Sequence, residues 1–268
     1  MIFEILVFAC PLLLASAGAL YSEYTGTLAL YLEGSITLSA FLTFALTVIT
    51  HNFILASFLT TIIISSILLF CGWIIEKYHG NVFITSLGLN LLFAGLSSFL
   101  SAIIFKTPGV LSSPLFAFNK TQVILYSIII TVILISAGGY VLFFTQKGVY
   151  FRTTGSDADV LKVKGINISN YKISSWAIAG LFASQAGTLL AMRVSSFVPN
   201  ISAGRGWMAL AAVYLGKKKL WKIIAFSLLF CGADYLGANI QNFIPGIPSS
   251  LLLALPYLAV LLLSLGLN

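Results

Sequence analysis

The chain has 268 residues, of which 59% are hydrophobic and only 8% are charged. Soluble domains are about 25% charged, so the composition excludes an ordinary soluble enzyme and predicts an integral membrane protein. The formal net charge of +7 comes from basic residues in a few short loops, a pattern that sets membrane orientation and does not indicate nucleic-acid binding.

Nine hydrophobic stretches follow one another along the chain. About 20 apolar residues cross a bilayer as a helix, so we expect an all-α polytopic bundle of roughly eight to nine spans, some of them short or broken. Residues 1–268 then form a single transmembrane domain. The expected spans are residues 5–20, 28–49, 53–75, 82–105, 123–144, 173–192, 207–215, 223–236 and 247–265. The stretch 207–215 is too short to cross, which favours a re-entrant or broken helix.

The first stretch and the loops set the expected topology. No basic residues precede the first stretch, which favours a retained helix over a cleaved signal. Residues 147–172 and 216–222 hold most of the lysines and arginines, so both segments are predicted to be cytoplasmic. The loops 106–120 and 195–204 then face outward. The orientation of the N-terminus stays open, because a broken helix near Thr25 would change the count.

Four polar residues lie in or beside the hydrophobic stretches and are candidates for a substrate pathway: Glu33, Asn90, Asp234 and Gln241. Polar and ionisable groups are costly in a membrane and often mark a functional site. Each also has a structural alternative. Glu33 could staple a re-entrant turn, and the other three could bond to a neighbouring helix.

Other residues are assigned structural roles. The three cysteines are expected to be small core residues, and no ligand spacing predicts a metal site. Arg193 and Arg205 flank an outward loop and are expected to extend toward the membrane surface, with contact to acidic groups on an extracytoplasmic binding protein as the alternative. A stripe of small residues on one helix predicts a tight helix contact, with a subunit interface as one possible place; it comprises Ala179, Gly180, Ala183, Ser184 and Gly187.

One polar insert interrupts the hydrophobic pattern in the loop of residues 146–172. Ser156 or Asp157 is a helix N-cap signal, a short helix over residues 158–163 is predicted, and Gly165 is a typical stop. The residues alone leave two interpretations open. The helix could lie on the membrane surface, or it could dock in the groove of a partner protein.

Four segments, in chain order, resemble motifs of the permease family of bacterial ABC importers for nucleosides, simple sugars and branched-chain amino acids. They are residues 21–26 with 32–34, residues 88–90, residues 152–157 with 165–167, and residues 204–211. The resemblance is strongest to the nucleoside-type branch. One departure is that Ala29, Leu30 and Tyr31 stand where the family has Asn-Leu-Gly, so a different substrate, including riboflavin, is a candidate.

The resemblance implies that the polar insert is a coupling helix that fits a cleft of a cytoplasmic ATPase. The residues implied in coupling are Arg152, Thr153, Gly155, Asp157, Val160, Leu161 and Gly165. Val160, Leu161 and Val163 would fill the cleft. ATP and magnesium would bind the ATP-binding subunits, so no cofactor is expected on this chain. The other implied partners are a second permease, identical or paralogous, and an extracytoplasmic substrate-binding lipoprotein at the bacterial inner membrane.

The function expected from this resemblance is import of a small polar heterocycle such as a nucleoside or riboflavin. A simple-sugar or branched-chain amino acid permease is the alternative within the family. A proton-coupled secondary transporter using Glu33 and Asp234 is the rival outside it. The chain has no H-E-x-x-H or G-x-S-x-G motif, which argues against an enzyme.

Overall fold

The computed structural model describes residues 2–240, 258, 260 and 261, and this part of the chain is almost entirely helical. The all-α membrane fold predicted from the composition is confirmed. The elements are α1 (Ile2–Tyr24), α2 (Leu32–Thr50), α3 (Phe53–Tyr78), α4 (Val82–Phe105), β1 (Leu111–Ser112), the 3-10 turn η1 (Pro114–Phe116), α5 (Lys120–Phe144), α6 (Gln146–Ser156), α7 (Ala158–Val163), α8 (Ile168–Val194), β2 (Ser196–Phe197), α9 (Arg205–Leu215) and α10 (Leu220–Ile240).

Within the described residues, seven helices are long and apolar enough to cross a membrane: α1, α2, α3, α4, α5, α8 and α10. The helix α9 has 11 residues and is about 16 Å long at 1.5 Å per residue, so it is too short to cross, as the sequence predicts. The ninth expected stretch, residues 247–265, lies outside the described residues except at three positions, and the candidate Gln241 lies outside them too.

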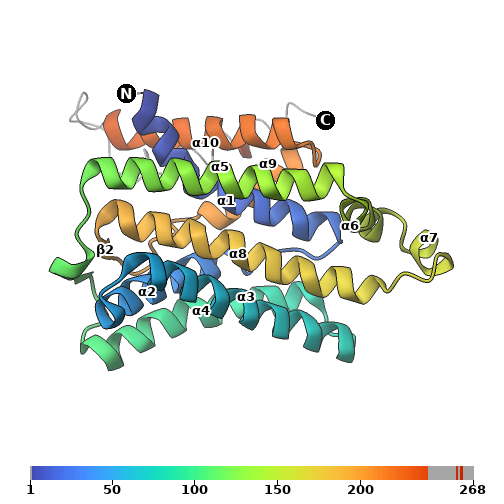
Figure 1. Cartoon of the computed structure of the whole chain (residues 1–268), viewed down its shortest axis with the longest axis horizontal. Coiled ribbons are helices and arrows are strands. Elements are labelled where there is room, and N and C mark those ends of the chain that lie inside the picture. Colours follow the sequence, from blue (N-terminus) through green and yellow to red (C-terminus); the bar gives the residue numbers. More distant parts are fainter. Residues whose placement is uncertain (1, 241–257, 259, 262–268) are drawn as a thin grey trace.

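The bundle has two distinct ends. In Figure 1 the helix α7 projects at the right-hand end, and the short ribbon of β1 and β2 closes the left-hand end. Tyr24 donates a hydrogen bond to the carbonyl of Lys218 (2.6 Å), and Lys172 pairs with Glu76 (3.4 Å). These contacts gather both basic loops at the α7 end, in agreement with the predicted cytoplasmic side. The helix α1 ends there, so it begins at the outer end.

The core is formed by α1, α2 and α8, which are mostly buried, while α3, α4, α5 and α10 surround them with exposed apolar faces. The small residues of α8 explain its central place. A Cβ at Gly180 would lie 2.8 Å from a methyl carbon of Leu68, and a Cβ at Gly187 would collide with Ser39. The expected tight helix contact is therefore confirmed, but it lies inside the chain and not between subunits.

Residues 25–31 re-enter the membrane without helical structure. Ser86 donates a hydrogen bond to the Leu28 carbonyl (2.9 Å), and the Asn90 side-chain oxygen accepts one from the Gly34 amide (2.6 Å). Asn90 is eight residues into α4, so the first turn of α2 lies about 12 Å from the N-terminal end of that helix. Irregular backbone at this depth requires protein partners, which α4 supplies.

Candidate functional site

The loop of residues 146–172 contains two consecutive helices, α6 and α7, at the end of the bundle where α7 projects, and it runs into the start of α8 (Figure 1). The predicted bounds of α7 are confirmed. The Asp157 carboxylate accepts a hydrogen bond from the Val160 amide (3.4 Å), and Gly165 has a φ of +70° just after the helix. The helix α6 is an addition to the prediction. It begins where the Thr145 hydroxyl accepts a hydrogen bond from the Gly148 amide (3.2 Å).

The apolar residues of α7 divide between two faces. Val163 is 89% exposed and Val160 is 44% exposed, so both side chains are available to a partner. Leu161 is only 2% exposed and packs inward. The expectation that Leu161 fills a partner's cleft is therefore revised: it anchors α7 to the rest of the chain, and the exposed apolar surface consists of Val160 and Val163.

The polar residues around α7 are mostly paired locally. Lys162 and Asp159 form an exposed ion pair (2.9 Å), and the hydrogen bond and charge of Lys162 lower the pKa of the Asp159 carboxyl. Thr153 donates a hydrogen bond to the Val149 carbonyl of its own helix (2.9 Å). The Arg152 guanidinium lies over the Phe143 ring (5.5 Å), and within residues 2–240 its Nε atom has no hydrogen-bond partner.

Gly155 brings α6 into direct contact with the end of α1. A Cβ at this position would collide with the Tyr24 carbonyl oxygen and lie 2.8 Å from the Gly26 amide nitrogen. Gly26 itself has a φ of +74°, which favours glycine. The two motif segments that the sequence singles out around residues 21–26 and 152–157 therefore touch, a contact that the sequence analysis missed.

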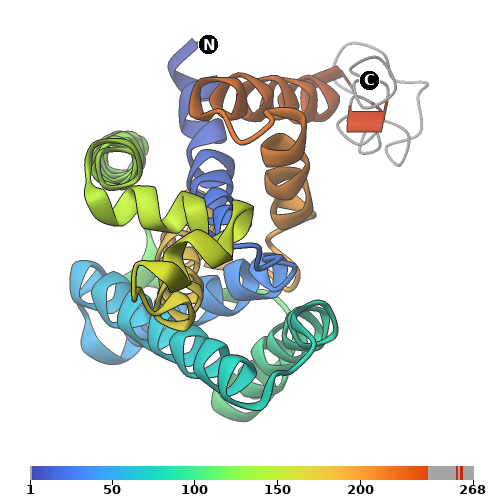
Figure 2. The ribbon, with the colours of Figure 1, turned by 90° about the vertical axis from the view of Figure 1, so that its right-hand side faces the viewer.

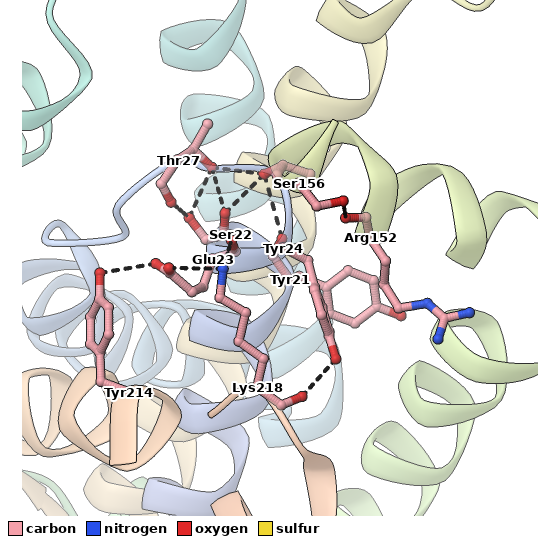
Figure 3. A network of polar contacts seen from close by, with 10 residues as sticks. Tyr21, Ser22, Glu23, Tyr24, Thr27, Arg152, Ser156, Tyr214 and Lys218 are labelled. Carbon is pink, nitrogen blue, oxygen red and sulfur yellow. Dashed lines mark hydrogen bonds and ion pairs between the residues drawn. The ribbon is translucent and has the colours of Figure 1, made fainter. Parts of the chain in front are cut away.

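A polar network joins the end of α1 to the turn between α9 and α10 (Figure 3). Glu23 accepts a hydrogen bond from the Tyr214 hydroxyl (3.1 Å) and forms an ion pair with Lys218 (3.2 Å). Tyr24 bonds to the Lys218 carbonyl from the neighbouring position. Sequence reasoning did not find Tyr214 or Lys218.

Buried hydroxyl groups connect the turn that follows α1 to α8. Thr25 donates a hydrogen bond to Ser175 (2.8 Å), and the hydroxyls of Thr27 and Ser175 are 3.1 Å apart. The Ser22 hydroxyl bonds to the Thr27 carbonyl. With every hydroxyl in contact with another, the polar turn is satisfied without water. These bonds join the end of α1, residues 25–27 and the start of α8 in one buried polar cluster.

Glu33 links the first turn of α2 to the start of α9. Its carboxylate accepts hydrogen bonds from the Ser202 hydroxyl and from the amides of Gly204 and Gly206, each 2.6 Å long. The amides belong to the N-terminal end of α9, where the helix dipole favours a negative charge. This arrangement matches the structural alternative for Glu33, a staple between two segments, although the sequence did not identify the partner segment.

Asp234 and Arg205 form a shielded ion pair at the same end of α9. The Arg205 guanidinium lies 2.9 Å from the Asp234 carboxylate and also donates to the Ser202 carbonyl (3.3 Å). Arg205 is only 6% exposed, so the expectation that it extends to the membrane surface is wrong. Its guanidinium instead lies over the Phe8 ring (5.4 Å) and holds α1, α9 and α10 together.

The described pathway candidates thus gather around the starts of two helices. Asn90 bonds the first turn of α2 to α4, and Glu33 bonds the same turn to the start of α9. Asp234 bonds to Arg205, also at the start of α9. Each has a partner inside the chain. Among the described residues, no group of three or more His, Cys, Asp or Glu side chains could hold a metal ion.

Comparisons with known proteins show which proteins this chain is similar to. A family model described as branched-chain amino acid transport system / permease component matches residues 1–265. The nucleoside ABC transporter permease protein NupC of Lactococcus lactis is 27% identical over 98% of this chain and 91% of its own length. The guanosine ABC transporter permease protein NupQ of Bacillus subtilis is 24% identical over 97% and 89%.

Sugar permeases match the chain to differing extents. The putative glucose ABC transporter permease protein TsgC13 of Haloferax volcanii is 26% identical over 87% of this chain and 75% of its own length. The ribose import permease protein RbsC of Escherichia coli is 36% identical over 31% of this chain and 26% of its own length. Among solved structures, PsaBC from Streptococcus pneumoniae in complex with Fab has a similar fold, with a TM-score of 0.53 and 17% identity over 97% of this chain and 89% of that one.

Proposed function

This chain belongs to the family of branched-chain amino acid transport system permease components, and from that premise we propose that it is the membrane-spanning subunit of an ATP-driven nucleoside importer. As a member of the family it is a multi-pass inner-membrane transport protein and not an enzyme. The observation that carries the nucleoside assignment is similarity along 97–98% of the chain to two nucleoside permeases, against 87% for a putative glucose permease and 31% for the ribose permease. No finding favours riboflavin.

Membership implies cooperation with ATP-binding subunits and a substrate-binding protein. We extend this to a specific composition: two permease chains, identical or paralogous, two cytoplasmic ATPases that hold ATP and magnesium, and an extracytoplasmic lipoprotein receptor. The exposed Val160 and Val163 on α7 support the docking of an ATPase, because an apolar helix face at the cytoplasmic end suits a protein groove.

The route from the ATPase into the membrane follows contacts of this chain. Force on α7 passes to α6, and α6 presses on the end of α1 at Gly155 and Tyr24. From there the re-entrant segment carries it to the first turn of α2, where Glu33 is bonded to the start of α9. The close contacts along this route support this order, because packed elements move as units.

The polar groups at the end of this route support the proposal that the substrate pathway lies close to them. Glu33, Asn90 and Asp234 each keep a bond to another helix, so a rearrangement of α2 or α9 would exchange these bonds for others. A nucleobase offers donors and acceptors of the same kind along its edge. Gln241 stays a candidate from its sequence position.

Uptake in reconstituted vesicles tests the substrate class. With the receptor and ATPase subunits present, we expect labelled guanosine to accumulate and unlabelled nucleosides to compete, while ribose, leucine and riboflavin in the same excess do not. If ribose or leucine competes and nucleosides do not, the nucleoside assignment is wrong but the chain remains a permease of this family.

A further inference from the structure

A large cavity opens between α5 and α10 at the cytoplasmic end of the bundle. Its volume is about 780 Å³, and its walls come from the second half of α5, the end of α1 and the start of α10. Figure 2, seen from the α7 end, shows α5 in green and α10 in orange flanking α1. Two residues of the polar network described above, Tyr24 and Lys218, also line this cavity.

The walls of the cavity are mostly apolar, and several of their side chains are exposed at the surface of the chain. Aromatic rings line it from both sides, with Tyr140, Phe143 and Phe144 on α5 and Trp221 on α10. Three of these, Tyr140, Phe144 and Trp221, are exposed. Gly139 leaves the floor open, since a Cβ there would meet only Leu220 at ordinary contact distance (3.5 Å). A groove of this kind fits an acyl chain.

Two lysines, Lys218 and Lys219, line one end of the cavity, and two more lie beside them in the sequence. Four lysines, Lys217, Lys218, Lys219 and Lys222, occur within six residues, and the left-handed backbone of Lys217 and Lys218 forms the turn that presents them. Glu23 pairs with Lys218. In the part of the chain that the structure describes, the exposed amine of Lys219, which lines the cavity, has no acidic partner.

From this combination we infer a binding site for an anionic phospholipid of the cytoplasmic leaflet. The phosphate group lies at Lys219 and Lys222, and an acyl chain lies along Gly139 and Phe143. Basic pockets between membrane helices on this side suit such head groups, and each lysine near the surface contributes to the attraction. The site does not depend on what the chain transports.

Lipid binding to the purified chain, with its co-purifying subunits, is measured by native mass spectrometry. We expect phosphatidylglycerol to bind in preference to phosphatidylcholine. Lys219→Ala should weaken phosphatidylglycerol binding about fivefold, and Lys219→Ala with Lys222→Ala about thirtyfold. The matched control is Lys77→Ala, a lysine at the same end that lies over the Trp73 ring, outside the cavity, and it should leave binding unchanged.

Two further arms separate a lipid from other occupants. Gly139→Leu fills the groove and keeps every lysine, so it should lower phosphatidylglycerol binding as well. Inorganic phosphate at millimolar concentration should not displace the lipid. The proposal is overturned if phosphatidylcholine binds equally, if Lys77→Ala matches Lys219→Ala, if Gly139→Leu has no effect, or if phosphate alone competes fully.

Discussion

Gly155 stands where α6 touches the end of α1, and a larger residue does not fit without displacing one of them. Its hydrogen atoms face the Tyr24 carbonyl and the Gly26 amide. Glu33 has the complementary role deeper in the membrane, where a single carboxylate satisfies donors from three residues. At both places one residue joins segments that are far apart in the sequence.

Adding a methyl group at Gly155 tests the first contact. Gly155→Ala should lower the free energy of unfolding by about 1–3 kcal/mol, the usual cost of overpacking. Thermal unfolding of the purified chain, followed by near-UV circular dichroism, measures the change. Gly95→Ala is the control, because no described atom lies within 4 Å of a Cβ on that α4 residue. Equal stability of Gly155→Ala and wild type would show that the contact is not tight.

Removing the carboxylate at Glu33 tests the contact between α2 and the start of α9. Glu33→Ala leaves the amides of Gly204 and Gly206 without an acceptor, so unfolding should become easier by about 2 kcal/mol or more. Glu33→Gln keeps one acceptor oxygen and should cost less. Asp159→Ala, which removes an exposed carboxylate from α7, should change the unfolding temperature little. A Glu33→Ala protein as stable as the Asp159 variant would contradict the capping role.

At this scale the sequence identified the unusual residues but not their partners. Glu33, Asn90 and Asp234 were recognisable because polar groups are rare in membrane spans. Glu33 bonds to the start of α9, Asn90 bonds to the backbone amide of Gly34, and Asp234 pairs with Arg205. Nothing local in the sequence indicates a contact between residues such as 33 and 204. The prediction for Arg205 was wrong because a long cationic side chain near a loop usually reaches water.

At the scale of elements, α7 was predictable to the residue and α6 was not. Asp157 and Gly165 are strong local signals for the start and end of a helix. The helix α6 follows α5 after the single residue Thr145 and contains glycines at positions 148 and 155, which lower helix propensity. Tertiary packing of these glycines against α5 and α1 stabilises it, and that packing is invisible in the sequence.

The exposed face of α7 leads to a prediction about ATPase binding. Val160→Asp with Val163→Asp puts two charges on the surface that we propose docks in the ATPase, so co-purification of the ATPase subunits should fall at least tenfold. The unfolding temperature should stay near that of wild type, since both side chains are exposed. Undiminished co-purification would exclude this face as the docking surface.

At the scale of the whole molecule, composition predicted the helical bundle and the basic loops predicted its orientation. Hydrophobicity alone did not reveal which helices form the core. The central helices α1, α2 and α8 carry many buried serines, threonines and small residues, whereas the outer helices present bulky apolar side chains to lipid. In a membrane, close packing and hydroxyl bonds select the core, because lipid tails are as apolar as leucine.

The central claim is that this bundle is driven by a separate ATPase acting at its cytoplasmic end. The most direct test is nucleoside uptake into vesicles that contain the assembled complex, measured with ATP, with a non-hydrolysable ATP analogue, and with a proton gradient but no nucleotide. We expect uptake only with hydrolysable ATP. Uptake driven by the proton gradient in the absence of the ATPase would contradict the account.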